Sequence, residues 1–341
     1  MKPVIALVQG DAAGIGPELL AKLLAHDEVR DAANILVISD PGVFAMGCRT
    51  AQTDPALHMI SDYGHADFSL GRPNLLDVTQ CLGTSALDLA EITAGEVSTK
   101  AGRTVLEGFG LALDLAKERQ IDGLCFLPFN KQAMHQAGLG TEDELQWAKA
   151  RLGYDGRASE FNVIDGMWNA RVTSHVPLRE VADRLSVDGI VASIELAHQT
   201  LRVAGFERPR IAVAALNPHA GDGGAIGREE IEIIRPAVER AKKQQIACEG
   251  PFPSDTLYIK VRDGRYDCAL SMYHDQGQIA IKLLGFEMGV SVHGGLPLPI
   301  TTPAHGTAFD IAGLNRANVE PVRRAFLMAV EMAANRRADS A

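Results

Sequence analysis

The feature that most constrains this sequence is a repeated alternation between short runs of largely β-branched residues and longer amphipathic segments. The short runs have the length and composition of buried strands, and they occupy residues 4–8, 35–38, 123–127, 170–173, 211–215 and 269–272. Helical periodicity is present at residues 18–25, 104–119, 177–185, 190–204, 228–243 and 321–336. Because parallel strands need long crossover connections, this alternation predicts an α/β fold with a mostly parallel sheet covered on both faces.

The length of the chain allows two domains of ordinary size, or one large α/β unit with an insertion. It has 341 residues, of which 46% are apolar and 22% charged, a composition that can bury a full core. Two segments break the strand–helix pattern and are candidate hinges between domains, namely residues 128–131 and residues 294–299.

Charge and cysteine usage exclude several classes of protein. The formal net charge is -10, and no cluster of Lys and Arg is visible, which argues against nucleic-acid binding. The apolar run at residues 4–8 is too short for a signal sequence, and no apolar stretch is long enough to span a membrane. The five cysteines stand singly, which suits a reducing compartment, so we expect a cytoplasmic protein without structural zinc of the finger type.

Three histidines in turn-like sequence are the strongest chemical signal. His175, His219 and His274 each stand just after a predicted strand, where open α/β sheets bind their ligands. Imidazole is the commonest protein ligand for borderline divalent metals, and three of them leave a coordination position open for a substrate. The alternative is that each histidine only fills a turn, and the spacing along the chain does not decide between the two.

A glycine-rich loop, Gly10-Asp-Ala-Ala-Gly-Ile-Gly-Pro-Glu18, follows the first predicted strand. Pro17 suits the first turn of a helix, and the backbone N–H groups before it could face an anion. The loop lacks the Rossmann pattern GxGxxG, and glycines at such a turn are also common for steric reasons.

The segment Thr302-Pro-Ala-His-Gly-Thr-Ala-Phe-Asp-Ile-Ala-Gly313, followed by Asn318, resembles the loop that holds the adenosine end of the cofactor in isocitrate and isopropylmalate dehydrogenases. The resemblance implies that His305, Gly306, Thr307 and Asn318 bind NAD, with NADP as an alternative. The competing interpretation is an ordinary loop that leads into a helix capped by Thr307 or Asp310.

Two lysines and one aspartate are candidate catalytic groups. Lys282 lies in the apolar run 278–284 and Lys131 follows a strand, and a partly buried lysine can hold a carboxylate or exchange protons. The alternative for Lys282 is an aliphatic stem that reaches out from the edge of the core. Asp255 is either a helix cap or an acid near the metal.

Seven segments spread over almost the whole chain form a common pattern, namely residues 10–18, Asn130-Lys131, Thr173-Ser-His175, Asn217-Pro-His-Ala-Gly221, Ser254-Asp-Thr-Leu257, Tyr273-His-Asp-Gln-Gly277 and His305-Gly-Thr-Ala308. Together they resemble the 4-hydroxythreonine-4-phosphate dehydrogenase family of vitamin B6 synthesis.

The resemblance implies an isocitrate/isopropylmalate dehydrogenase-like fold with two α/β/α domains and an active-site cleft between them. Residues 1–128 and 295–341 would form the first domain, and residues 129–294 the second, which carries the dimer interface. It further implies that His175, His219 and His274 bind one divalent ion, namely Zn, Mn, Mg or Co, and that Lys282 contacts the substrate. The enzyme would be a homodimer with shared active sites, in which His274 serves the neighbouring subunit.

The sequence departs from the family where the substrate phosphate is held. The family's Gly-His-Thr-Glu loop is replaced by Gly138-Leu-Gly-Thr-Glu-Asp-Glu-Leu145, Ser291 stands where the family has Asn, and Ile300 stands where it has Arg. Charge-assisted hydrogen bonds carry phosphate recognition, so these changes predict a different substrate. We expect that Thr141, Glu142, Asn217 and Ser291 contact that substrate.

The sequence therefore predicts a divalent-metal- and NAD-dependent oxidation of a secondary alcohol beside a carboxylate, with decarboxylation to follow. The substrate placed first is a cis-dihydrodiol of an aromatic dicarboxylate such as terephthalate, because some relatives outside B6 synthesis act on such compounds. The first alternative is 4-hydroxythreonine-4-phosphate dehydrogenase, and a non-catalytic ligand-binding protein on the same fold is the second.

Overall fold

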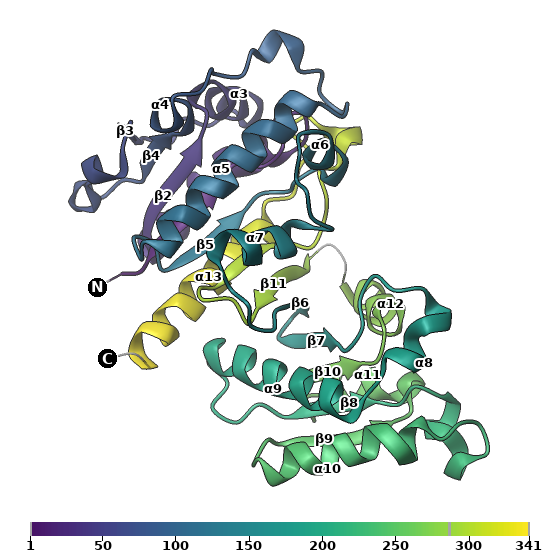
Figure 1. Cartoon of the computed structure of the whole chain (residues 1–341). Coiled ribbons are helices and arrows are strands. Elements are labelled where there is room, and N and C mark those ends of the chain that lie inside the picture. The colour runs from purple at the N-terminus through teal and green to yellow at the C-terminus, as the bar shows by residue number, and fades with distance from the viewer. Residues whose placement is uncertain (1, 286–287, 340–341) are drawn as a thin grey trace. The chain divides into compact units, whose positions relative to one another are not determined.

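The computed structural model describes residues 2–285 and 288–339, and the chain divides into two compact units (Figure 1). Unit 1 contains Met1–Asp155 and Leu296–Ala341, so the C-terminal segment returns to the N-terminal unit. Unit 2 contains Gly156–Gly295. Each unit contains six strands and the helices that pack against them.

The sheet of unit 1 has the strand order β3-β4-β2-β1-β5-β12 and is parallel throughout. The central strand β1 has the sequence VIALV and is almost wholly buried, as expected for a strand covered on both faces. The strands of this unit are β1 (Val4–Val8), β2 (Asn34–Ser39), β3 (His58–Ile60), β4 (Asn74–Asp77), β5 (Gly123–Phe126) and β12 (Ile300–Pro303).

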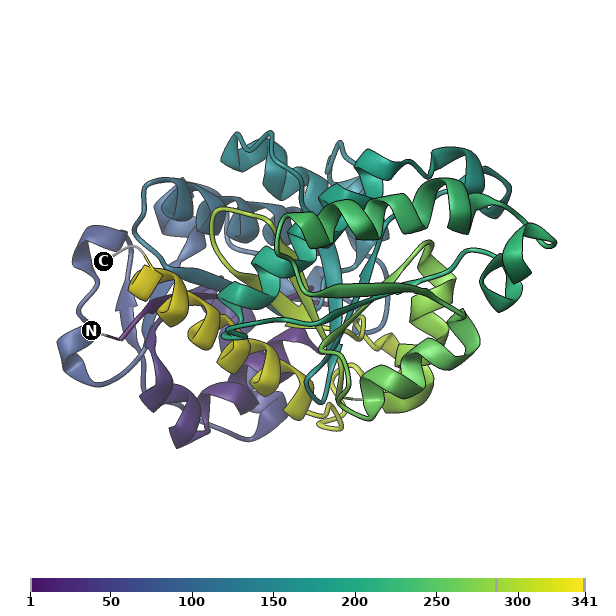
Figure 2. The ribbon, with the colours of Figure 1, turned by 90° about the horizontal axis from the view of Figure 1, so that it is seen from below.

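Helix α5 packs on one face of the unit 1 sheet, and α1, α2 and α13 form a layer on the other (Figure 2). Ser98 caps α5 by accepting a hydrogen bond from the N–H of Ala101, which fixes where this helix begins. The helices are α1 (Gly16–Leu24), α2 (Asp27–Ala32), α3 (Pro41–Ala51), α4 (Val78–Leu82), α5 (Thr99–Lys117), α6 (Lys131–Gln136), α7 (Glu144–Leu152) and α13 (Glu320–Asp339).

The sheet of unit 2 has the strand order β11-β6-β7-β10-β8-β9. Strand β6 is antiparallel to both of its neighbours, whereas β7, β10, β8 and β9 run parallel to one another. The strands are β6 (Ser159–Ile164), β7 (Met167–Arg171), β8 (Ile211–Ala214), β9 (Cys248–Phe252), β10 (Cys268–Ser271) and β11 (Val290–Gly294).

Helices α9 and α10 pack together on one side of the unit 2 sheet, while α11 and α12 contact its central strands. Ile164, Leu257, Tyr258 and Ile281 belong to the apolar core that α11 and α12 share with the sheet. The helices are α8 (Val181–Arg184), α9 (Val187–Val203), α10 (Arg235–Lys243), α11 (Ser254–Arg262) and α12 (His274–Gly285).

The unit boundary differs from the one predicted from the sequence. The first prediction ended the N-terminal segment of domain one at residue 128, but unit 1 continues to Asp155. The reason is that α6 and α7, which follow the break at residues 128–131, both pack against α5. The second predicted boundary, between residues 294 and 295, lies one residue before the observed change.

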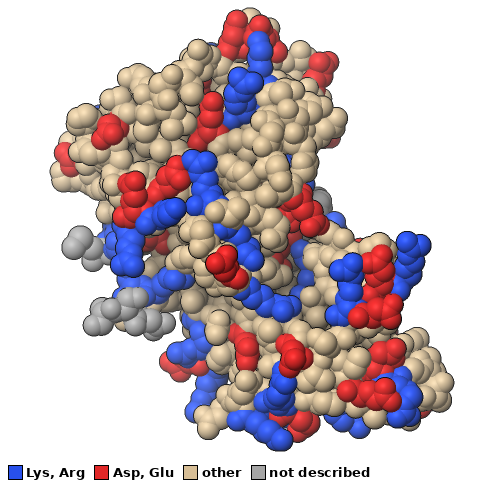
Figure 3. Space-filling view, viewed as in Figure 1, with Lys and Arg blue, Asp and Glu red and all other residues tan. Residues whose placement is uncertain are grey.

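The surface carries charges of both signs, which alternate over the face drawn in Figure 3. None of the described helices is long and apolar enough to cross a membrane. All five cysteines are free thiols, and Cys125, Cys248 and Cys268 are buried. Burial raises the pKa of the Cys248 thiol to about 11, so this group behaves as an apolar core residue.

Candidate active site

The three histidines follow three neighbouring strands of the unit 2 sheet. His175 comes after β7, His274 after β10 and His219 after β8, and these strands lie side by side in the order β7-β10-β8. Because β10 is parallel to both β7 and β8, the three strands end at the same edge of the sheet. This edge is the predicted metal-binding region.

The rings of His175 and His274 come together at this edge, with 5.7 Å between their centroids and an interplanar angle of 45°. Nδ1 of His274 lies 2.7 Å from Oδ1 of Asp275, so it donates to the carboxylate, and Nε2 is the nitrogen left to bind a ligand. A metal-binding histidine ordinarily donates its other ring nitrogen to such a carboxylate. The bond to Asp275 therefore suits His274 as a metal ligand, but the ligand nitrogens of His175, His219 and His274 do not all lie within 4.8 Å of one another in the described part of the chain.

His219 lies in a loop of unusual backbone conformation. His219, Ala220 and Asp222 have φ values of 53°, 55° and 42°, and the two glycines interspersed with them, Gly221 and Gly223, are also left-handed. Each non-glycine residue in this conformation costs roughly 1–2 kcal/mol, so the run must be held by other contacts. Backbone strain of this kind is concentrated at functional sites.

A side-chain network that the sequence analysis did not find ties the loops of this edge together. The Gln276 side chain accepts a hydrogen bond from the N–H of Met272 (2.6 Å), and its Nε2 donates to the carbonyl of Ala215 and to Ser254 Oγ. Ser254 also donates to Ala215, at 3.0 Å. The loops after β8, β9 and β10 are thereby joined. Ser254 and Gln276 lie in segments that resemble the family, but nothing in the sequence showed that they bond to each other.

The candidate catalytic residues of unit 2 are both exposed. Asp255 lies in the first turn of α11 but does not cap it, because the N-cap residue is Pro253. Lys282 lies on the exposed side of α12, the helix that begins at His274.

The candidate substrate residue Ser291 belongs to a buried polar network between β6, β7, β11 and α12. Ser291 donates to Glu160 at 2.7 Å, and Arg171 donates to the other oxygen of Glu160 at 2.6 Å. Arg171 and Gln278 also donate to Asn162. Burial opposes ionisation of Glu160, but the cation of Arg171 and the bond from Ser291 outweigh it and lower the pKa to about 2.

The same arginine supports the loop of His175. Arg171 Nε donates to Ser174 Oγ at 3.0 Å, and Ser174 directly precedes His175, whose φ is 37°. The side chain of Arg171 is only 2% exposed. It therefore links the candidate substrate residue Ser291 to one of the candidate metal ligands.

The candidate cofactor loop in unit 1 packs against the glycine-rich loop. Ile15 N–H donates to the carbonyl of Thr307, and a Cβ on Gly14 would lie 2.8 Å from Cβ of Thr307. The glycine-rich loop is buried, so close packing is the observed reason for its glycines. A Cβ on Gly306, in contrast, would meet no atom within 4 Å, which leaves this backbone open to a ligand.

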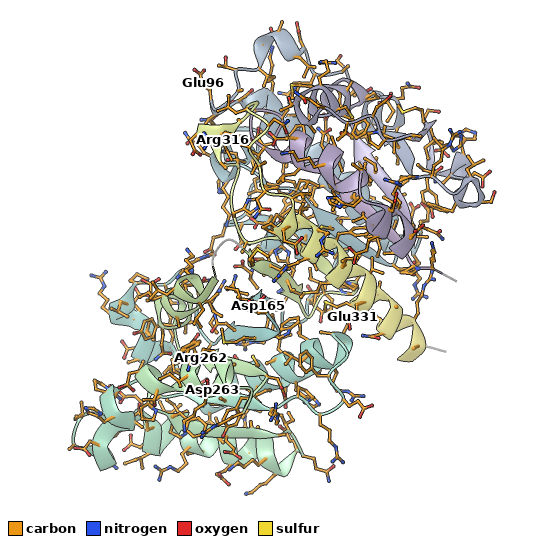
Figure 4. All side chains as sticks on the ribbon, turned by 180° about the vertical axis from the view of Figure 1, so that it is seen from behind. Glu96, Asp165, Arg262, Asp263, Arg316 and Glu331 are labelled. Atoms are coloured by element: carbon orange, nitrogen blue, oxygen red, sulfur yellow. The ribbon has the colours of Figure 1, made fainter. Side chains whose placement is uncertain are left out.

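The other cofactor candidates have defined local partners. His305 Nδ1 donates to the carbonyl of Gly306, and burial lowers the pKa of its ring, although this bond opposes the shift. Asn318 accepts from the N–H of Glu320 at the start of α13. Neither Thr307 nor Asp310 caps the 3₁₀ turn Phe309–Ile311, whose N-cap residue is Ala308. Figure 4 labels Glu96 and Arg316, both exposed at this end of unit 1.

Asp11 is a buried acid that the sequence analysis did not single out. Its side chain is fully buried, one oxygen accepts from the N–H of Ala13 at 2.8 Å, and the other has no partner among the described residues. Burial raises the pKa of Asp11 to about 6, although the bond from Ala13 opposes this shift.

The remaining candidates lie in or beside the acidic segment of unit 1. Lys131, at the first position of α6, is 3.6 Å from Glu144 and is 55% exposed. Asp143 caps α7, and Thr141 donates to the carbonyl of Asp143. Glu142 is exposed. The predicted metal ligands thus all belong to unit 2, and the predicted cofactor residues to unit 1.

Comparisons with known proteins decide the family. The family model described as "Pyridoxal phosphate biosynthetic protein PdxA" matches residues 31–329. The chain belongs to the PdxA family. A relative from Pseudomonas aeruginosa is 48% identical over 97% of both chains, and one from Rhizobium meliloti is 46% identical over all of this chain and 96% of the relative. Both carry the name "Putative 4-hydroxythreonine-4-phosphate dehydrogenase 2".

Other members of the PdxA family have related names. A protein from Cupriavidus necator, named D-threonate 4-phosphate dehydrogenase, is 36% identical over 98% of both chains. All of these relatives are named dehydrogenases, so the prediction of an oxidoreductase that acts on a CH–OH group is confirmed at the level of the family.

Solved structures of the PdxA family share the fold. A 4-hydroxythreonine-4-phosphate dehydrogenase from Klebsiella pneumoniae is 34% identical, with a TM-score of 0.82 over 98% of both chains. The predicted α/β fold class is therefore confirmed. A terephthalate 1,2-cis-dihydrodiol dehydrogenase from Burkholderia xenovorans is less similar, with 25% identity and a TM-score of 0.65 over 94% of both chains.

Proposed function

We propose that the chain catalyses the NAD-dependent, divalent-metal-dependent oxidation of the secondary alcohol of a small hydroxy acid of the 4-hydroxythreonine 4-phosphate type. Relatives that are 46–48% identical over nearly the whole chain support this substrate type. The single structural observation that supports the chemistry best is the pair of rings of His175 and His274, 5.7 Å apart at the edge where His219 also lies.

His175, His219 and His274 would hold the divalent ion. A bound divalent ion acts as a Lewis acid that lowers the pKa of the substrate hydroxyl. Asp275 would orient His274 by accepting from its Nδ1, which directs Nε2 to the ligand side. Arg171 would support His175 through Ser174.

Lys282 is the residue we propose as carrier of the alcohol proton. It lies on α12 together with His274, and its side chain is exposed. Lys131 is a weaker candidate, because Glu144 lies 3.6 Å from its ammonium group. NAD, or alternatively NADP, would bind to unit 1 through His305, Gly306, Thr307 and Asn318, where the open backbone of Gly306 leaves room for a flat base.

One specific observation favours a second candidate, the oxidation of an unphosphorylated hydroxy acid. Ser291 lies against the carboxylate of Glu160, and Ile300 is fully buried on β12, so neither position supplies a cation to a phosphate. A low pKa at Glu160 places negative charge beside Ser291. Glu142 adds a further acid to the segment that replaces the phosphate loop.

The cis-dihydrodiol substrate that the sequence analysis placed first is not retained. The protein named for that activity is 25% identical, against 46–48% for the relatives named for a phosphorylated amino acid. We propose no decarboxylation step, because the names of the relatives specify dehydrogenases only.

We also propose a homodimer with shared active sites, as the family resemblance implied. Within one chain the ring of His274 already lies 5.7 Å from that of His175. The alternative is a site formed within one chain, and an experiment has to distinguish it from a site shared between two subunits.

The substrate is tested by incubating metal-free protein with Zn²⁺, Mn²⁺ or Mg²⁺ and NAD, and by following NADH formation. Matched pairs should be compared, namely 4-hydroxythreonine and D-threonate, each with and without the 4-phosphate. Higher kcat/KM for the phosphorylated members supports the first function, and the reverse order supports the second. No NADH from any of them would overturn both.

A further inference from the structure

We propose that Glu230 is a positioning residue that holds the His219 loop in its left-handed conformation and so prepares His219 to bind metal. This inference rests on the proposed function, in which His219 is a metal ligand. Glu230 does not touch the metal or the substrate in this account. It acts through the backbone of Leu216 and Asn217.

Glu230 is fully buried, and its carboxyl group accepts hydrogen bonds from the loop alone. Oε1 accepts from the N–H of Leu216 at 2.9 Å and from the N–H of Asn217 at 2.7 Å. Oε2 accepts from Asn217 Nδ2 at 3.0 Å. Among the described residues Glu230 forms no ion pair, so these hydrogen bonds replace the hydration that its carboxyl group loses on burial.

The loop closes around Glu230 so tightly that glycine is required at two positions. A Cβ on Gly221 would lie 2.7 Å from Glu230 Oε2, and a Cβ on Gly227 would lie 2.3 Å from Asn217 Nδ2. Gly221 is in the middle of the left-handed run that begins at His219. The conformation of His219 is therefore coupled by direct contact to the position of the Glu230 carboxyl group.

Glu230 differs from an ordinary helix cap in the residues that its side chain contacts. Glu230 is the first residue of the π-helix Glu230–Ile234, and its side chain reaches back to Leu216 and Asn217 rather than to the N–H groups of its own helix. Buried partners that orient the ligands of a metal typically change metal affinity 10–100-fold when they are replaced.

The test compares Glu230→Gln with the matched control Glu232→Gln in the full-length protein. Glu232 lies on the same helix but is 56% exposed and pairs with exposed Arg228. Zn²⁺ binding to metal-free protein is measured by titration calorimetry, with circular dichroism to verify the fold. We expect Zn²⁺ affinity to fall about 10–100-fold in Glu230→Gln and to be unchanged in Glu232→Gln.

Rescue by excess Zn²⁺ and a second variant show whether Glu230 acts on metal binding or only on folding. Excess Zn²⁺ should restore turnover in Glu230→Gln, since the ligands are still present and only their placement is weakened. If Glu230→Gln does not fold, Glu230→Asp takes its place, because its shorter side chain draws the carboxylate away from the N–H groups of Leu216 and Asn217 and should lower Zn²⁺ affinity in the same way.

Wild-type Zn²⁺ affinity in a folded Glu230→Gln or Glu230→Asp variant would overturn the inference, as would an equal loss in Glu232→Gln. His219→Ala distinguishes this failure from failure of the proposed function. If His219→Ala binds Zn²⁺ as tightly as the wild type, His219 is no ligand and both proposals fall. If His219→Ala loses binding while Glu230→Gln keeps it, only the role of Glu230 is wrong.

Discussion

The imidazole rings of His175 and His274 lie 5.7 Å apart, although the two residues follow strands that are far apart in the sequence. Strands β7 and β10 are parallel neighbours, so the turns that leave them meet at one edge of the sheet. The third histidine, His219, follows β8 on the other side of β10.

Replacing any one of the three histidines with alanine should abolish metal-dependent turnover and leave the fold intact. We expect kcat/KM to fall by more than about 100-fold, because loss of a supporting residue alone costs 10–100-fold in such sites. His198→Ala is the control, since His198 lies on α9, away from this edge. Wild-type activity of His219→Ala in chelator-treated buffer would contradict the metal mechanism.

Mixing inactive variants tests whether the sites are shared between subunits. If His274 serves the partner's site, co-folded His175→Ala and His274→Ala chains should regain about a quarter of wild-type activity, since half the dimers are mixed and each has one intact site. NADH formation after co-refolding measures this. No recovery would indicate that the two rings that lie 5.7 Å apart in one chain form the functional pair.

Gly14→Ala should weaken NAD binding and leave Zn²⁺ affinity unchanged. The added Cβ would lie 2.8 Å from Cβ and 2.9 Å from the carbonyl oxygen of Thr307, so it must displace the candidate cofactor loop. We expect KM for NAD to rise about 10-fold, which corresponds to about 1.4 kcal/mol. The control is Gly108→Ala on α5, where a Cβ would make only ordinary contacts with Val8 and Ile38. An unchanged KM for NAD in Gly14→Ala would show that the proposal of His305–Thr307 as cofactor-binding residues is wrong.

Asp11→Asn should raise the free energy of unfolding at neutral pH. Burial raises the pKa of Asp11 from 3.8 to about 6, so between these values the folded state holds more protons than the unfolded state. The contribution of Asp11 to stability therefore falls as the pH rises from about 4 to about 6 and is constant above that. Two pH units correspond to about 3 kcal/mol, which is the upper limit for the gain.

Urea unfolding at a series of pH values measures the effect of Asp11→Asn. The exposed Asp255→Asn variant is the control, and it should keep the wild-type pH dependence. If the free energy of unfolding of Asp11→Asn changes with pH between about 4 and 6 as steeply as in the wild type, the burial of Asp11 is not the cause of that slope.

Arg171→Met should lower the free energy of unfolding by roughly 3 kcal/mol. This value is at the low end of the range for breaking a buried ion pair, because the partner Glu160 is 31% exposed. Glu160 would lose the cation that lowers its pKa and remain beside Ser291 without charge compensation. Glu160→Gln in the same chain should recover most of the loss. The control is Arg228→Met, whose pair with Glu232 is exposed and should change the free energy of unfolding by less than about 1 kcal/mol.

The pH dependence gives an independent measure of the same pair. The folded-state pKa of Glu160 is about 2 and its ordinary value is 4.5, so the stabilisation is complete above 4.5 and is lost as the pH falls from 4.5 to about 2. This acid-sensitive part of the unfolding free energy should disappear in Glu160→Gln. If Glu160→Gln and the wild type lose the same unfolding free energy as the pH falls, other carboxylates cause that loss.

Much of the fold could be predicted from local patterns in the sequence. The strand predicted at residues 4–8 is β1. The strand predicted at residues 211–215 is β8, which ends one residue earlier, at Ala214. The helix predicted at residues 177–185 is instead the 3₁₀ turn Leu178–Glu180 followed directly by the short helix α8. Strands β3, β4, β6, β9, β11 and β12 were missed. In β4, β6 and β12, polar residues at buried positions hide the apolar pattern.

The candidate site was predicted only in part, for a similar reason. His175, His219 and His274 could be proposed as metal ligands because histidines in turns after strands carry a local signal, and this role stays a prediction. Gln276, Ser254, Arg171 and Glu230 could not, because each acts through a partner on another strand or helix. The glycines at positions 10, 14 and 16 suggested an anion site, but in the structure they allow close packing of backbone.

The sequence by itself determined the α/β class, the positions of the main strands and helices, and which residue types follow the strands. These properties depend on the periodicity of apolar residues, which is set by short stretches of chain. Only the tertiary structure decided that β10 lies between β7 and β8, that Asp11 and Glu230 are buried, and that Arg171 pairs with Glu160. Strand order and burial depend on contacts between residues far apart in the chain, and no local pattern records those contacts.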